Sequence, residues 1–331
     1  MTNKILLIGP DYYGYNESVS QAFNKLGFIS EIFSYKEGLS IGNSILVRGK
    51  FIKHNELPSV AIINQAILRK YIEFKPDIVL VIKGTLLSEA TLIQLKQSIL
   101  LLWMMDSVFR FPDVLNKLVY FDHLFMFEKT DVLKLKQINI DSVFLPMAYD
   151  ESVYYPIINT KKEVDIFFVG SLFDKRLDTF YDLIEEFKGY NLKFFGKRIF
   201  TKNKPLKYFL NKSIFPNRNL SPNEINKYYN SSRICLNIHK TQSVHGLNPR
   251  FYEILGANSH QIVNNNPLIQ ELFPNNEISV FSNFDELKHQ VKMYLEKGPN
   301  ESFDNNKTYQ FIRDNHTFTN RVQIILSQLQ L

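Results

Sequence analysis

"KPDIVLVIKGTLLSEATLIQLKQSILLLWMMD" (Lys75–Asp106) contains two apolar runs with a helix-like segment between them. The runs IVLVI and ILLLWMM show no regular alternation of polar and apolar residues. Strands of this kind have both faces buried, as the strands of a parallel sheet do. A strand, a helix and a second strand in this order therefore predict a βαβ unit in a parallel sheet with helices on both faces.

The same alternation extends through the first half of the chain. Strands are expected at 4–9, 28–33, 123–128 and 141–146, and helices at 17–27 and 58–74. In the first of these helices Val19, Ala22, Phe23 and Leu26 recur at helical spacing, and Gly27 stands where a C-cap belongs. We therefore predict a doubly wound, Rossmann-like α/β domain over residues 1–150.

The second half repeats this architecture after a proline-containing segment, 146–164, which we interpret as a linker. Strands are expected at 165–171, 192–196, 234–239, 260–263 and 278–282, and helices at 178–187, 221–232, 250–257, 283–298 and 309–331. Ser221, Pro222 and Glu224 have the capping-box pattern of a helix start. The prediction is a second Rossmann-like domain, 151–331, facing the first across a cleft, with the last helix a candidate to pack back on the first domain.

Composition narrows the classes of function. Of the 331 residues, 45% are hydrophobic and 22% charged, which is typical of a globular protein. The formal net charge of +6 suits an anionic small ligand or contact with a membrane surface, and no nucleic-acid partner is expected. The chain has one cysteine, Cys235, so we expect no internal disulfide and no thiolate zinc site. Without a signal-peptide pattern or a long apolar run, we expect a cytoplasmic protein, with the inner face of the membrane as a candidate location.

In an open α/β sheet the ligand binds beyond the carboxyl ends of the strands, so the residues that follow strands are the candidates. GSLFDKR (Gly170–Arg176) is the clearest phosphate candidate, because a Gly-Ser turn lets the backbone approach a ligand. The candidate contacts to a diphosphate-bearing ligand are Gly170, Ser171, Lys175, Arg176 and Lys197. The alternative is a solvated basic turn at an ordinary helix start. Neither the G-x-G-x-x-G nor the G-K-[ST] fingerprint is present.

A second candidate is NIHKTQSVHGLNPRFYE (Asn237–Glu253), a loop that leads into a helix. A carboxylate accepts two hydroxyl hydrogens at once, so Glu253 is a candidate to hold a sugar diol. Arg250 is a candidate for phosphate or for orienting Glu253, and the alternative is a structural Arg–Glu pair. His239, His245 and Asn248 complete the predicted contacts, with His245 also a candidate catalytic residue.

In the first half, Asp106 and Asp11 follow predicted strands, and either is a candidate base for an acceptor hydroxyl. The two histidines of the second-half loop have no acidic or thiolate partner at ligand spacing, so no metal site is predicted.

Several segments together resemble the CgeB-like, spore-maturation-type glycosyltransferases. They are DIVLVIKG, LLLWMMDSV, FDHLFMFEKTDVLKLKQINIDSVFLPMAYDESVYYP, DIFFVGSLFDKR, NPRFYEILGANSHQIVNNNPLIQELFP and DNHTFTNRV. The resemblance implies a GT-B fold, a sugar nucleotide held by the second domain, an acceptor bound by the first, and transfer without a metal. It aligns Glu253 with the glutamate that holds the ribose. A second glutamate, common eight residues earlier in GT-B enzymes, is here His245, which leaves the stereochemistry open.

The sequence therefore predicts a glycosyltransferase that moves a sugar from a nucleoside diphosphate, UDP first, to a hydroxyl of a surface-glycan precursor or glycosylated protein. The co-substrate is the sugar nucleotide, with no other cofactor, and the acceptor is a glycan, lipid-linked or protein hydroxyl. Two alternatives stay open: a sugar-nucleotide epimerase or hydrolase on the same fold, and a non-catalytic nucleotide- or glycan-binding module.

Overall fold

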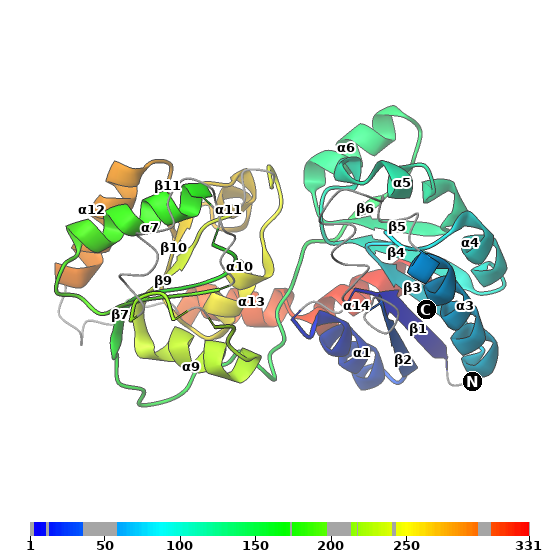
Figure 1. The fold of residues 1–331 in the computed structure, drawn as a ribbon, viewed down its shortest axis with the longest axis horizontal. Coiled ribbons are helices and arrows are strands. Elements are labelled where there is room, and N and C mark those ends of the chain that lie inside the picture. Colours follow the sequence, from blue (N-terminus) through cyan, green and yellow to red (C-terminus); the bar gives the residue numbers. More distant parts are fainter. Residues whose placement is uncertain are drawn as a thin grey trace. The chain divides into compact units, whose positions relative to one another are not determined.

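The computed structural model describes residues 3–10, 13–35, 58–172, 174–196, 213–216, 218–239, 243–296 and 306–330. The chain forms two compact units, one made of Met1–Met147 with Phe318–Leu331 and the other of Ala148–Thr317. Each unit is an α/β layer structure around one parallel sheet (Figure 1).

The first unit is built on a parallel sheet with strand order β2-β1-β3-β4-β5-β6. Its strands are β1 (Lys4–Gly9), β2 (Ile29–Ser34), β3 (Ile78–Ile82), β4 (Ile99–Met104), β5 (His123–Met126) and β6 (Val143–Phe144). Its helices are α1 (Tyr15–Lys25), α3 (Pro58–Phe74), α4 (Glu89–Leu95), α5 (Pro112–Leu115), α6 (Lys129–Gln137) and α14 (Phe318–Gln328), with 3-10 turns η3 (Val108–Arg110) and η4 (Leu118–Tyr120). Because β1, β3, β4 and β5 are mostly apolar, their side chains fill the core on both faces of the sheet.

The C-terminal helix α14 completes this unit by packing against α1 (Figure 1). Its first residue, Phe318, lies edge-on to Trp103, with ring centroids 6.3 Å apart. The buried Arg321 donates from its guanidinium to the backbone oxygens of Pro146 (2.8 Å) and Met147 (2.9 Å). A charged side chain can be buried here because its donors are satisfied by carbonyl oxygens at the end of the first segment of the chain.

The second unit has a parallel sheet with strand order β11-β10-β9-β7-β8. Its strands are β7 (Val164–Val169), β8 (Leu192–Phe195), β9 (Ser232–Asn237), β10 (Gln261–Asn264) and β11 (Ser279–Phe281). Its helices are α7 (Asp174–Glu186), α9 (Pro222–Ser231), α10 (Pro249–Gly256), α11 (Pro267–Leu272), α12 (Phe284–Glu296) and α13 (Asn306–Asn315). Figure 1 shows α7 and α12 on one face of the sheet and α9 on the other. Stacked aromatic rings such as Phe180 and Phe194, 4.5 Å apart, fill the α7 face.

The structure confirms the predicted α/β class and the repeated parallel-sheet architecture. The capping box of Ser221 and Glu224 is present at the start of α9. Three details were predicted wrongly. The 309–331 segment is two helices, α13 and α14, which separate at His316 and Thr317, where Tyr149 forms a β-bridge with Thr317. The helix expected at 178–187 begins at Asp174, so Arg176 lies in its first turn. Helices α6 and α11 were not predicted.

Candidate functional site

The strand order of the second unit has its topological switch point between β7 and β9. The chain passes from β7 to β8 on one side of the sheet and then crosses to β9 on the other side. Ligands of open α/β sheets bind at such a point, outside the carboxyl ends of the strands. The residues at this place are Gly170 and Ser171, which follow β7, and Ile238 and His239, which follow β9.

Two glycines bring the turns after β7 and β8 into backbone contact. A Cβ on Gly196 would lie 1.7 Å from the carbonyl oxygen of Gly170, and Gly196 has φ +153°. The Gly170 amide donates to Phe195 O at 2.9 Å. Only glycine fits at position 196, which fixes the turn that carries Gly170 and Ser171.

Arg176 ties the two sides of the switch point together. Its Nη1 donates to the carbonyl oxygen of Ser171 at 2.9 Å, and its Nη2 donates to the carbonyl oxygen of Ile238. The guanidinium carbon also lies 5.6 Å from the centroid of the Phe168 ring. Burial lowers the pKa of the Arg176 guanidinium to about 10, and the charge of Arg250 adds to this effect.

Arg250, the second residue of α10, brings another guanidinium to the same place. Its Nε lies 3.7 Å from the position that a Cβ on Gly170 would occupy. Arg176 bonds to the carbonyl oxygen of the next residue, Ser171, so both guanidinium groups lie at the same turn, and the charge of Arg250 lowers the pKa of Arg176. Two cations converging on the end of one strand make a strongly positive position at the carboxyl edge of the sheet.

Asn248 holds the start of α10 through both ends of its amide. Its Oδ1 accepts from the Phe251 amide at 3.1 Å, which makes it the N-cap. Its Nδ2 donates to Asn237 Oδ1 at 2.8 Å. The structure therefore gives Asn248 a scaffold role that tethers Arg250 to the end of β9. The predicted contact of Asn248 with a nucleotide stays a prediction.

Glu253 lies in the middle of α10 and is buried, with 3% of its surface exposed. Its Oε2 accepts a hydrogen bond from the Tyr229 hydroxyl at 3.2 Å. Burial raises the pKa of Tyr229 well above its ordinary value, and the neighbouring Glu253 carboxylate adds to this. The tyrosine therefore stays protonated and presents its hydrogen to the carboxylate.

The two histidines of this loop differ in their surroundings. His239 is buried and its amide and Nδ1 both face Asn264 Oδ1, with 3.3 Å between Nδ1 and Oδ1. Burial lowers the pKa of its imidazole to about 4; the charge of Arg176 acts in the same direction and the Asn264 contact opposes it. His245 pairs through Nε2 with Glu271 Oε1 at 2.8 Å. The Lys175 side chain and Lys197 lie outside the described residues.

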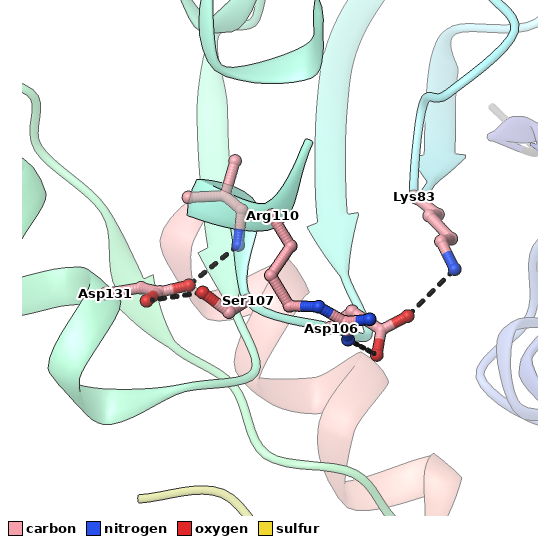
Figure 2. A network of polar contacts seen from close by, with 6 residues as sticks. Lys83, Asp106, Ser107, Arg110 and Asp131 are labelled. Atoms are coloured by element: carbon pink, nitrogen blue, oxygen red, sulfur yellow. Dashed lines mark hydrogen bonds and ion pairs between the residues drawn. The ribbon is translucent and has the colours of Figure 1, made fainter. Parts of the chain in front are cut away.

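In the first unit, Asp106 lies just after β4 and is held by two cations (Figure 2). Its Oδ2 accepts from Lys83 Nζ at 2.8 Å, and its Oδ1 accepts from Arg110 Nη1 at 3.2 Å. Lys83 Nζ also lies 4.8 Å from the centroid of the Phe111 ring. The three charged groups carry one net positive charge at the carboxyl edge of the first sheet.

The loop that bears Asp106 is fixed by Asp131, from the start of α6 (Figure 2). Asp131 accepts from the Val108 amide at 2.8 Å and from Ser107 Oγ at 3.0 Å. Burial raises the pKa of the Asp131 carboxyl, while these two hydrogen bonds oppose the shift. Asp131 thus secures the residues on the C-terminal side of Asp106.

Lys83 is held in an uncommon backbone conformation. It has φ +69° and is followed by Gly84 with φ +67°. Left-handed φ values are costly for lysine and persist where the surrounding structure imposes them. Lys83 follows β3, beside the first unit's own switch point between β1 and β3. Asp11, predicted at the end of β1, lies outside the described residues.

Sequence analysis singled out none of the five residues Lys83, Arg110, Tyr229, Asn264 and Glu271. For Lys83 and Arg110 the signal was present, because both are cations just after strands. Among the described residues, no three His, Cys, Asp or Glu side chains gather as a metal site would require. Transfer without a metal stays a prediction. No helix within the described ranges is both long and apolar enough to cross a membrane.

Comparison with known proteins assigns the fold. Residues 176–327 match the family model described as "Glycosyl transferase-like". Among curated proteins, no sequence matches the chain. The solved structures described next are 11–12% identical to the chain, so they establish the fold alone.

Three of these structures show the range of the likeness. Sucrose-phosphate synthase from Thermosynechococcus elongatus has a TM-score of 0.71 at 11% identity, covering 99% of both chains. The structure titled "Trehalose-6-phosphate from E. coli bound with UDP-2-fluoro glucose" has a TM-score of 0.69 at 11% identity, covering 99% of both chains. A putative UDP-N-acetylglucosamine 2-epimerase from Listeria monocytogenes has a TM-score of 0.58 at 12% identity, covering 100% of this chain and 96% of the epimerase chain. The chain has the GT-B fold, and residues 176–327 are similar to the glycosyl transferase-like family.

Proposed function

We propose that this GT-B chain is a glycosyltransferase, as the family match of residues 176–327 suggests. It moves a sugar from a nucleoside diphosphate, with UDP as the first candidate, to a hydroxyl of a glycan precursor or glycosylated protein. The observation that carries the proposal is the convergence of Arg176 and Arg250 at the end of β7. Like charges held near each other in a partly buried place are relieved by an anion, and the diphosphate of a sugar nucleotide supplies one.

The chemistry follows from this placement. When the bond between the sugar and the diphosphate breaks, negative charge grows on the leaving phosphate oxygen. The Arg176 guanidinium, already held by the carbonyl oxygens of Ser171 and Ile238, stabilises that charge without having to reorganise. Arg176 therefore fits a diphosphate contact, and Arg250, anchored through Asn248, fits the second.

Glu253 fits the ribose contact. Its carboxylate accepts hydrogen bonds from hydroxyl groups, and the Tyr229 hydroxyl fixes its orientation. The carboxylate is buried, so a ribose would make its contact at a largely dry surface. Hydrogen bonds to a charged group in such a place contribute about 1.5–3 kcal/mol.

The acceptor is assigned to the first unit. Asp106 is the candidate base if the reaction inverts the anomeric centre. To act as a base, Asp106 has to exchange one of its contacts with Lys83 or Arg110 for the acceptor hydroxyl. Otherwise Asp106 positions the two cations, and a variant that keeps the shape but not the charge distinguishes these roles.

A thermal-shift and calorimetry series with UDP, GDP, dTDP and CMP tests the donor assignment. A ligand at one hundred times its dissociation constant should stabilise the protein by about 2.7 kcal/mol. We expect UDP to stabilise the wild type and to do so less in Arg176→Ala and Arg250→Ala. If no nucleotide stabilises the protein, the donor site is wrongly assigned.

One alternative keeps specific support, because a putative UDP-N-acetylglucosamine 2-epimerase has the same fold. Incubation with UDP-sugars in the absence of any acceptor separates the two functions. Steady accumulation of an epimerised sugar nucleotide would favour the epimerase. Transfer that depends on an added glycan acceptor would favour the transferase.

A further inference from the structure

His239 is a buried polar side chain with one ring nitrogen unused. The residue follows β9, its surface is 4% exposed, and its Nε2 has no hydrogen-bond partner among the residues that the structure describes. Arg176 donates to the carbonyl oxygen of the preceding residue, Ile238, so His239 lies next to the proposed diphosphate contact. Buried polar atoms in native proteins are nearly always paired, so an unpaired one beside a ligand site points to the ligand.

The hydrogen-bond pattern fixes which nitrogen carries the proton. The His239 amide donates to the side chain of Asn264, so the accepting atom of Asn264 must be its oxygen. The same oxygen faces Nδ1 at 3.3 Å, and two acceptors cannot bond each other. Nδ1 therefore carries the hydrogen, and in the neutral ring Nε2 is left with its lone pair.

A neutral imidazole with a lone pair at Nε2 accepts a hydrogen bond and donates none there. Diphosphate oxygens at neutral pH are also acceptors, so they do not pair with this atom. The hydroxyl and N–H groups of a sugar nucleotide are donors and do pair with it. The Arg176 cation thus suits the phosphates of a sugar nucleotide, and the hydrogen-bond acceptor His239 Nε2 suits a hydroxyl or N–H group of the same ligand.

We propose that His239 Nε2 accepts a hydrogen bond from a hydroxyl or N–H group of the sugar nucleotide whose diphosphate lies at Arg176. The inference rests on the proposed function. It adds an uncharged contact, at which His239 Nε2 favours ligands that carry a hydrogen-bond donor. The donating group belongs to the nucleoside or to the transferred sugar, and a series of ligands distinguishes the two.

The first test is calorimetry of wild type and His239→Phe with pyrophosphate, uridine, UMP, UDP and UDP-glucose. Phenylalanine keeps the ring and removes Nε2, and Asn264 Oδ1 retains the backbone amide of residue 239. We expect unchanged binding of pyrophosphate and a loss of about tenfold, the size of one net hydrogen bond, for the ligands that carry the donor. A loss that begins at uridine or UMP places the donor on the nucleoside. A loss confined to UDP-glucose places it on the sugar.

The matched control is His260→Phe, which replaces a histidine of the same unit that is stacked on Tyr294 at 3.6 Å. It should leave all five affinities unchanged. Equal affinities of His239→Phe and wild type for every ligand would overturn the inference. If the wild type itself binds no uridine nucleotide, the proposed donor function fails, and the inference fails with it.

The second test reads the nitrogen directly and does not depend on the variant folding. In ¹⁵N-histidine-labelled wild type, the His239 Nε2 resonance should have the shift of an unprotonated ring nitrogen at pH 7. It should move towards the hydrogen-bonded range when UDP-glucose is added. A protonated Nε2 in the free protein would overturn the inference even if nucleotides bind.

Discussion

Lys83 Nζ lies 2.8 Å from Asp106 Oδ2, and the lysine reaches that position from a left-handed backbone conformation at the end of β3. The pair therefore links the carboxyl ends of two adjacent strands, β3 and β4, beside the backbone hydrogen bond that the Lys83 amide donates to Trp103 O at 3.0 Å. Arg110 joins the pair through Asp106 Oδ1, at 3.2 Å, so one carboxylate holds two cations at the carboxyl edge of the first sheet.

Asp106→Asn tests whether this carboxylate does chemistry. Asparagine keeps the shape and loses the charge, so a general base would be abolished. We expect kcat for transfer to fall by about 10²–10⁴, the usual contribution of general base catalysis, with the dissociation constant of UDP unchanged. Asp77→Asn is the matched control, because Asp77 precedes β3 at the opposite edge of the same sheet and accepts from the Lys4 amide. A fall in acceptor affinity with kcat intact would show that Asp106 positions cations instead.

Arg176→Lys should weaken UDP binding although it preserves the charge. A lysine ammonium cannot span the carbonyl oxygens of both Ser171 and Ile238 as the forked guanidinium does. We expect a loss of about 1.5–3 kcal/mol in UDP binding by calorimetry, and a smaller loss for uridine, which has no phosphate. Equal losses for UDP and uridine would mean that the substitution disturbs the whole pocket and not a phosphate contact.

The fold was predictable because it depends on apolar runs that lie next to one another in sequence. The bounds of β1 and α3 match the prediction, and the cap of α9 was visible in Ser221 and Glu224. The break at His316 and Thr317 was not predictable, because it depends on Tyr149, which is far away in the chain. Local periodicity carries no information about such a partner.

The sequence selected residues that follow strands, and the structure brings two of them, Arg176 and Arg250, to the turn after β7. That this place binds a ligand stays a prediction, and the contacts within it were less predictable. The contacts within the site join residues 3 to 26 positions apart. They are the Asn248 cap of α10, the bond between Glu253 and Tyr229, and the bond between His245 and Glu271. Sequence spacing shows that polar side chains follow the strands, but it does not show which of them are already hydrogen-bonded to other residues of the protein.

Stability should fall in mild acid because of His239. Its pKa is lowered to about 4 in the folded protein, from an ordinary 6.5, so the unfolded chain binds the proton more readily. Stability is therefore lost as the pH falls from about 6.5 towards 4, by about 2 kcal/mol between pH 7 and pH 5 for this group. Urea unfolding at both pH values measures it, and His239→Phe should lack this component. An identical pH dependence in wild type and variant would contradict the assignment.

Gly196→Ala should destabilise the second unit severely. The added Cβ would lie 1.7 Å from Gly170 O, so the turns after β7 and β8 would have to separate. Gly189→Ala is the control, because Gly189 also has positive φ, +97°, but nothing lies within 4 Å of its Cβ position. The control should lose about 1 kcal/mol from backbone strain alone. Gly196→Ala should lower the free energy of unfolding, measured in urea, by several times that amount. Equal losses in the two variants would show that the turns after β7 and β8 can move apart easily.

The ribose contact of Glu253 is tested most sharply by changing protein and ligand together. If the carboxylate holds the 2′-hydroxyl, wild type should bind UDP more tightly than 2′-deoxy-UDP by about 1.5–3 kcal/mol. Glu253→Gln should lose most of that preference, because the amide accepts with one oxygen only. Tyr229→Phe should reduce the preference less, since it removes the hydroxyl that orients the carboxylate but not the carboxylate itself. If Glu253→Gln keeps the full preference for UDP in calorimetry, Glu253 does not contact that hydroxyl and its bond to Tyr229 is structural.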